Sequence, residues 1–186
     1  MPAAAEREME AGRMERPATI KVWDLFVRTF HWSLVVLFAL AWVSEDLQSL
    51  HQPVGYGILG LVVLRIVWGF IGSPHARFSD FVRSPKATLA YGRDLLAGRA
   101  PHRRGHNPLA AVMVLALLTM LVATGTSGWM MTLDGYQSAE WLEELHEGLA
   151  SATLVLVGLH VLAVAIMSAV HGENLVRAMI TGRKKA

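Results

Sequence analysis

Four long apolar runs limit what this 186-residue chain can fold into. They cover residues 25–43, 54–71, 109–129 and 145–170, and 53% of the whole chain is hydrophobic. A helix of about 20 apolar residues is long enough to cross a lipid bilayer. The runs therefore predict an all-α fold, an integral membrane four-helix bundle. Little of the chain remains for a second large domain.

Basic and acidic residues alternate from one connection to the next. Every Lys and Arg except Arg65 lies before residue 29, between 77 and 104, or after 176. The connections after the first and third runs contain acidic residues and no basic ones. Cytoplasmic segments of membrane proteins are enriched in Lys and Arg, so we expect both termini and the middle connection to be cytoplasmic. Because topology accounts for the basic residues, we expect no nucleic-acid partner.

The segments outside the apolar runs are short. Residues 1–20 are polar and without periodicity, which predicts a flexible cytoplasmic tail before a membrane domain of residues 21–186. Residues 85–96 mix apolar and basic residues, which predicts a short helix on the inner membrane surface, although a solvated loop fits that pattern equally well. Pro53 should stand near the start of the second helix, and Asn107 should cap the third.

Two histidines share the fourth run, fourteen residues apart. At about 100° per residue, His146 and His160 leave one helix face within roughly 40° of each other. They are separated by about 21 Å along the axis, which places one near each membrane surface. The other two membrane histidines fall at the same two depths, His31 near the inner surface and His51 near the outer one.

A polar side chain in the hydrocarbon region is energetically costly, so the four membrane histidines need an explanation, and two are available. Each histidine taken singly could be a structural hydrogen-bond donor between helices. Together, the two matched depths favour axial ligands of two stacked hemes, with the pairs His31–His160 and His51–His146. Neutral imidazole binds iron, and its second ring nitrogen should be held by a carbonyl or a carboxylate. The chain has no cysteine, which excludes covalent heme attachment through a CxxCH motif and cysteine-ligated iron–sulfur clusters.

Arg65 is the one basic residue in the middle of an apolar run. We expect it to pair with a heme propionate or to shape a quinone pocket, because it lies too far from the helix end for easy snorkelling. Three glycines in the same run could admit a flat macrocycle or simply permit close helix packing: Gly55, Gly57 and Gly60. The remaining histidines should be surface or interfacial residues and not ligands: His75, His102, His106 and His171.

Motifs occur in nearly every part of the chain after residue 20. They are the segments 22–32 (VWDLFVRTFHW), 51–72 with RIVWG at 65–69, 76–81, 105–108, 145–147 and 172–182. Together they resemble the bacterial cytochrome b561 and nickel–iron hydrogenase b-type cytochrome family. The resemblance implies that residues 21–186 form a four-helix diheme cytochrome b domain with two noncovalent b hemes and quinone-linked electron transfer. It also implies axial ligation by His31, His51, His146 and His160.

The predicted outer surface is uniformly acidic, which bears on the redox partner. Such a surface attracts a basic protein, for example a periplasmic cytochrome c, and repels anions. Superoxide is an anion, so the acidic surface disfavours the activity of superoxide:ubiquinone oxidoreductases, which some family members resemble. Topology alone also explains the acids, since bases are kept inside. The residues are Glu45, Asp46, Asp134, Glu140, Glu143, Glu144 and Glu147.

The favoured function is a membrane diheme b-type cytochrome of the bacterial inner membrane. It would transfer electrons between a membrane quinone, ubiquinone or menaquinone, and a periplasmic redox partner. The alternatives are a superoxide:ubiquinone oxidoreductase, a non-redox transporter that uses the buried histidines and Arg65, and an anchor subunit for a soluble enzyme. A transporter would be colourless, and an anchor would tolerate loss of the four histidines.

Overall fold

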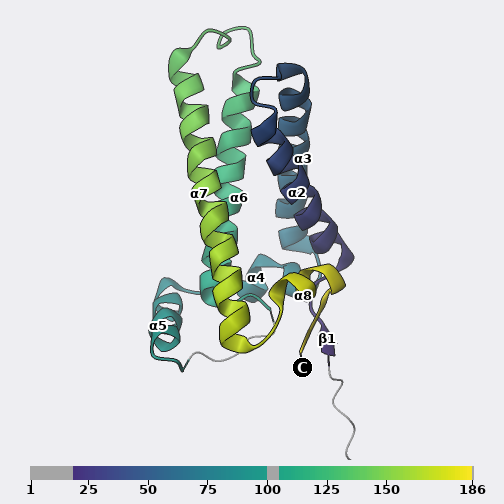
Figure 1. Cartoon of the computed structure of the whole chain (residues 1–186), viewed down its shortest axis with the longest axis vertical. Helices are drawn as coiled ribbons and strands as arrows, with labels where there is room; N and C mark the ends of the chain where they lie inside the picture. The colour runs from purple at the N-terminus through teal and green to yellow at the C-terminus, as the bar shows by residue number, and fades with distance from the viewer. Residues whose placement is uncertain (1–18, 100–104, 186) are drawn as a thin grey trace, which may run out of the picture.

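The four predicted membrane helices are present in the computed structural model, which describes residues 19–99 and 105–185. Within those residues, four helices are long and apolar enough to cross a membrane. They are α2 (Leu25–Val43), α3 (Gln48–Ile71), α6 (Pro108–Met130) and α7 (Glu140–His171). Figure 1 shows α7 and α2 at the front of the bundle, with α6 and α3 behind them. The fold is therefore mostly helical, as predicted.

Polar caps fix where two of these helices begin. Asp24 accepts a hydrogen bond from the Val27 backbone N–H at 2.7 Å, at the start of α2. Asn107 does the same for Ala110 at 2.8 Å, with Pro108 in the first turn of α6. Each cap satisfies a backbone donor that has no partner inside its helix.

The predicted start of the second membrane helix is wrong by six residues. Helix α3 begins at Gln48, so Pro53 lies in its second turn instead of at its start. His51 N–H already bonds to the Leu47 carbonyl at 2.8 Å, which starts the helix early. Proline removes only one backbone donor, and that loss is tolerated because it falls near the helix end.

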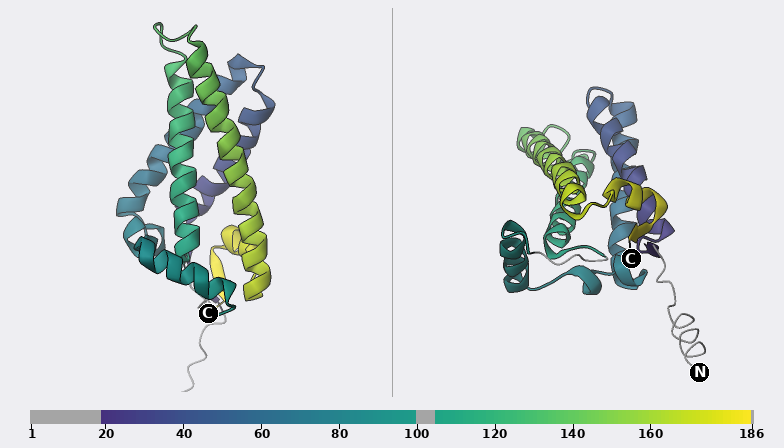
Figure 2. Two further views of the ribbon diagram at one scale, coloured as in Figure 1. Left: turned by 90° about the vertical axis from the view of Figure 1, so that its left-hand side faces the viewer. Right: turned by 60° about the horizontal axis from the view of Figure 1, so that its bottom comes forward.

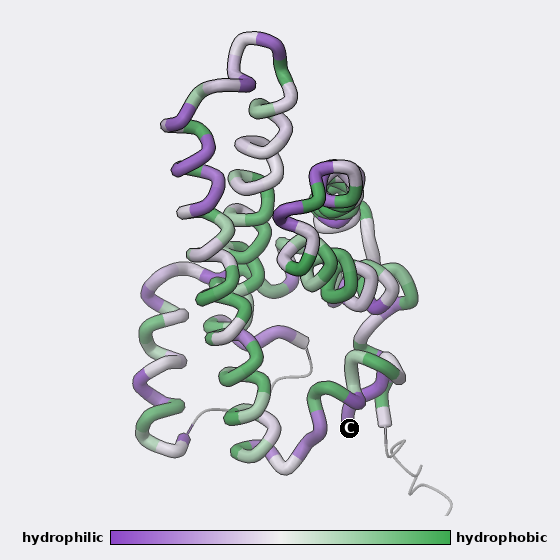
Figure 3. Tube along the Cα trace, turned by 45° about the horizontal axis from the view of Figure 1, so that its top comes forward, coloured by the Kyte–Doolittle hydropathy of each residue, from purple (hydrophilic) through white to green (hydrophobic). Residues whose placement is uncertain are grey.

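Helices pack in the order α2, α3, α6, α7, so α3 and α6 form the middle of the bundle. The main buried apolar cluster of the bundle is formed by residues of α2, α3 and α6: Phe30, Val54, Ile58, Val62, Leu118 and Leu121. Many large apolar side chains on the outer faces of the bundle remain exposed, as expected where lipid replaces water. In Figure 3 hydrophobic residues run along the long helices, and hydrophilic ones gather toward the ends and connections.

Short elements surround one end of the bundle, called the inner end below. They are η1 (Pro74–Ala76), α4 (Phe78–Phe81), α5 (Pro85–Leu96) and α8 (Leu175–Thr181). The helix predicted over residues 85–96 is confirmed as α5, which Figure 2 shows to one side of the bundle, opposite α8. The inner end carries the basic residues of the connections, and the opposite, outer end carries the acidic ones.

A small antiparallel sheet at the inner end was not predicted. Strand β1 (Thr19–Lys21) pairs with β2 (Arg183–Lys185), with Ile20 opposite Lys184. The sheet joins the first and last described residues, so both lie at the same end of the bundle. Thr19 and Ile20, the last residues of the predicted tail, belong to β1, and the rest of that tail lies outside the described residues.

Candidate functional site

The structure brings His31 and His160 together near the inner end. His31 lies in the second turn of α2, and His160 lies in the inner half of α7. Their ring centroids are 6.4 Å apart, and the ring planes are inclined by 56°. These residues come from the first and last helices of the packing order, so the pair joins α2 to α7.

His51 and His146 form a second pair near the outer end. His51 lies in the first turn of α3, and His146 lies in the second turn of α7. Their ring centroids are 6.2 Å apart, with the planes at 82°. One helix, α7, therefore contributes a histidine to each pair.

Backbone carbonyls orient both outer imidazoles. His51 Nδ1 lies 3.0 Å from the Ala41 carbonyl oxygen on α2, and His146 Nδ1 lies 3.1 Å from the Thr124 carbonyl oxygen on α6. The Ser127 hydroxyl, 3.0 Å from His146 Nδ1, donates its own proton to the Thr124 carbonyl at 2.9 Å. A carbonyl only accepts, so each Nδ1 carries the proton and donates it. The lone pair then stays on Nε2, the nitrogen that remains available to a metal.

In the inner pair, His31 lacks this support. His31 Nδ1 is buried and has no hydrogen-bond partner in the described part of the chain. Trp32 lies edge-on to the His31 ring, with centroids 5.1 Å apart. The two pairs thus have the same spacing but different surroundings.

The spacing of each pair suits one metal ion held between two imidazoles. A metal–nitrogen bond is about 2 Å long, and each ring adds about 1 Å from its nitrogen to its centre, which gives about 6 Å between centroids. Among the described residues there is no group of three or more His, Cys, Asp or Glu side chains that could hold a metal ion. Two imidazoles without further protein ligands fit a metal that brings its own in-plane ligands, as heme iron does.

Glycines near the pairs differ in their surroundings. A Cβ atom on Gly128 would lie 2.9 Å from His146 Cε1, so only glycine leaves room for that ring. A Cβ on Gly55 or Gly60 would meet no heavy atom within 4 Å, and one on Gly57 would make an ordinary 3.4 Å contact with Leu37. Gly55 and Gly60 therefore do not mark close helix packing within this chain.

Arg65 lies fourteen residues after His51 on α3, so it occupies the inner level of the same helix face. Its side chain is 3% exposed. Nη2 donates to the Ala76 carbonyl at 3.2 Å, and the guanidinium lies 5.6 Å from the Phe78 ring centroid. Nη1 is buried and has no hydrogen-bond partner among the described residues. This free donor is available to an anionic group.

Arg65 is not the only buried base. Lys184, in β2, is 7% exposed and forms an ion pair with Glu173 at 3.4 Å. The sequence analysis assigned the basic residues after 176 to the cytoplasmic side and did not identify Lys184 as buried. The reason for the difference is the β1–β2 sheet, which folds the C-terminal segment back beneath α2 (Figure 1).

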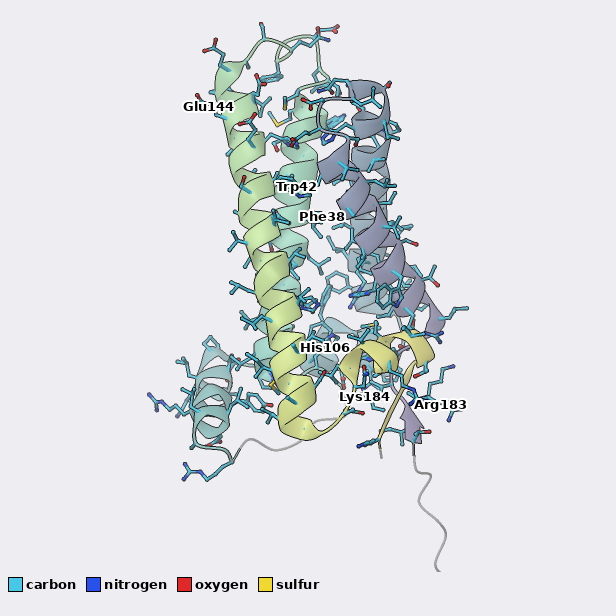
Figure 4. All side chains as sticks on the ribbon, in the orientation of Figure 1. Phe38, Trp42, His106, Glu144, Arg183 and Lys184 are labelled. Carbon is cyan, nitrogen blue, oxygen red and sulfur yellow. The ribbon has the colours of Figure 1, made fainter. Side chains whose placement is uncertain are left out.

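His106 was missed by the sequence analysis, which predicted a surface or interfacial position. Its ring lies between Trp23 and Phe81, with centroids 4.6 Å and 4.7 Å away. Burial, reinforced by the positive charges of Arg65 and Lys184, lowers the pKa of His106 to about 3. Figure 4 shows it at the inner end, above Lys184. One signal was available: His106 precedes the capping residue Asn107, a position whose side chain often packs inward.

The other three predicted surface histidines lie away from both pairs or outside the described residues. His75 is half-buried and contacts Asp80 at 3.3 Å. His171 is the last residue of α7. His102 lies outside the described residues.

Asp24 ties α2 to the inner end of α3. Its carboxylate accepts hydrogen bonds from Trp68 Nε1 and from the Ser73 hydroxyl, besides capping α2. Burial alone would raise the pKa of Asp24, but these hydrogen bonds and the nearby Arg65 outweigh it and hold that pKa below its ordinary value. Asp24 is therefore an anion beside Arg65.

Comparisons with known proteins identify the family of the chain. A model of the family described as prokaryotic cytochrome b561 matches residues 22–182. The chain is also similar to a protein of Bradyrhizobium diazoefficiens described as a probable Ni/Fe-hydrogenase B-type cytochrome subunit. The two are 22% identical, and the alignment covers 98% of this chain and 91% of that protein. No solved structure matches the chain.

Proposed function

This chain belongs to the prokaryotic cytochrome b561 family and is a multi-pass membrane b-type cytochrome that acts in electron transfer. We propose that it binds two hemes, one near each membrane surface. His31 and His160 would ligate the inner heme, and His51 and His146 the outer one. The observation that carries this proposal is the spacing of the two pairs, 6.4 Å and 6.2 Å between centroids. Heme b would supply one-electron exchange at each site.

The chain's own residues would hold and orient these groups. Ala41 and Thr124 carbonyls fix the outer imidazoles with Nε2 free, and Gly128 leaves space for the His146 ring. At the inner site, Arg65 Nη1 offers a buried donor to a propionate. The helices keep the two levels about 21 Å apart along α7.

The acidic outer end favours a periplasmic redox protein with a basic surface, such as a c-type cytochrome. Neither outer connection contains Lys or Arg. Seven acidic residues are exposed there: Glu45, Asp46, Asp134, Glu140, Glu143, Glu144 and Glu147. The same charge repels superoxide and so disfavours a superoxide:ubiquinone oxidoreductase. The other partner would be ubiquinone or menaquinone, in the bacterial inner membrane. Electron transfer to a basic cytochrome c should slow as salt rises, and a rate independent of salt would contradict this docking surface.

Heme content per chain tests the proposal directly. The purified wild-type protein should contain two hemes with low-spin b-type spectra. His160→Ala should lose the inner heme and keep the outer one, and His146→Ala should do the reverse. His75→Asn, which lies outside both pairs, is the matched control and should keep two. Two hemes in either alanine variant, or no heme in the wild type, would overturn the ligand assignment.

A further inference from the structure

The two histidine pairs differ in the charges that surround them. At the outer pair, each Nδ1 donates to a backbone carbonyl, and the adjacent charges are acidic, with Glu143 and Glu147 on either side of His146 in α7. Residues 29–64 and 105–176 contain no Lys or Arg. The outer pair is therefore surrounded by electron-donating hydrogen bonds and negative charge.

Two arginines lie near the level of the inner pair along the bundle, one on α2 and one on α3. Arg28 precedes His31 by three residues, so it occupies the same side of α2, one turn closer to the inner end. Its Nε is buried without a hydrogen-bond partner in the described structure, and its Cδ and Nη1 lie against the terminal turn at Gly182. Arg65 is also buried and keeps Nη1 free of protein acceptors.

Other charged groups at the inner end do not cancel this positive charge. Lys184 and Glu173 form a pair that is neutral as a unit. His106 is uncharged at neutral pH, because its pKa is about 3. Asp24 supplies one negative charge against the two arginines. Asp80, on α4, is 41% exposed and lies against His75. The inner end therefore keeps a net positive charge beneath the His31–His160 pair.

We propose that the inner site holds the higher-potential heme of the two, and that Arg28 and Arg65 set this order. The inference rests on the proposed bis-histidine ligation. An oxidised heme carries one more positive charge than a reduced one, so nearby cations favour reduction, most strongly at low dielectric. Carboxylates and Nδ1–H···O=C hydrogen bonds make the imidazole more basic and favour the oxidised state.

This order has a direct functional consequence. An electron that enters at the outer end would be more stable at the inner site, so electrons would collect on the side that carries the basic residues. The protein itself would then favour transfer from the outer toward the inner surface, with one site losing the electron that the other gains.

Redox titration of the heme absorbance tests the order, with the single-heme variants assigning each component. His160→Ala keeps only the outer heme and should show the lower midpoint potential. His146→Ala keeps only the inner heme and should show the higher one. The reverse order would overturn the proposal. A wild-type protein without two hemes would instead overturn the proposed function, so the two failures are distinguishable.

Charge-removing variants test the cause. Arg28→Gln and Arg65→Gln should each lower the potential of the inner component and leave the outer component unchanged. Glu147→Gln should raise only the outer component. Arg77→Gln removes the same charge from an exposed inner-end position and should shift neither. Low-spin spectra and two hemes per chain verify that each variant keeps its ligands. An inner potential that both arginine variants leave unchanged would contradict the proposal.

Discussion

Because Gly128 has no side chain, it leaves space for the His146 imidazole in its observed orientation. A Cβ there would lie 2.9 Å from His146 Cε1 and 3.3 Å from Nδ1, so the ring would have to turn away from the Thr124 carbonyl. We predict that Gly128→Ala loses the outer heme and keeps the inner one. The displaced hydrogen bond alone costs about 0.5–1.5 kcal/mol.

Gly148, on α7, is the matched control for this substitution. A Cβ on Gly148 meets nothing within 4 Å, so Gly148→Ala should keep both hemes and stabilise the helix by up to about 1 kcal/mol. Heme per chain and the thermal midpoint measure both effects. If Gly128→Ala retained two hemes, the close approach at His146 would not matter for the site.

His106 predicts a pH dependence of stability. The pKa of His106 is about 3 in the folded chain and 6.5 when the residue is exposed. Between pH 3 and pH 6.5, therefore, His106 is protonated in the unfolded chain and neutral in the folded chain. Stability from this group is complete above pH 6.5 and falls as the pH drops toward 3. Asp24 acts in the same direction, but only below its ordinary value of 3.8.

The phenylalanine variant isolates this effect. His106→Phe keeps a ring between Trp23 and Phe81 and removes the titration. Thermal midpoints of the purified protein at pH 7.5 and pH 5 should differ for the wild type and differ less for the variant. Equal differences in the two proteins would assign the pH dependence to another group.

Among the secondary-structure elements, those with continuous patterns were the predictable ones. Residues 25–43 and 85–96 have the observed bounds of α2 and α5. An apolar run that Arg28 and His31 interrupt near its inner end, and a Ser-Pro helix start, are both local signals. The pairing of histidines could also be proposed from the fourteen-residue spacing on α7. Whether two rings lie 6 Å apart depends on how four helices pack, which no single spacing determines.

Elements defined by distant contacts were not predictable. The three-residue strands β1 and β2 are too short for an alternating pattern, and each exists only because the other pairs with it. Their pairing in turn buries Lys184 near His106, and no local pattern in the sequence indicates this contact. The start of α3 was predicted wrongly for a different reason. A proline such as Pro53 indicates that a helix begins nearby, but it does not determine the residue at which the helix begins.

At the scale of the whole molecule, charge asymmetry predicts orientation. The inner end holds the basic connections and both ends of the described chain, so it should face the cytoplasm. The chain has no cysteine, which makes single-cysteine labelling unambiguous. Ser138 is exposed in the outer connection, and Ala97 is exposed after α5.

These two positions allow a direct test of topology. In spheroplasts, a membrane-impermeant maleimide should label Ser138→Cys, and it should label Ala97→Cys only after the membrane is opened. Because both side chains are exposed, a difference in labelling reports sidedness and not burial. The opposite labelling pattern would mean that the protein has the reverse orientation in the membrane. The acidic end would then meet cytoplasmic partners, and the arginine-rich histidine pair would lie on the periplasmic side.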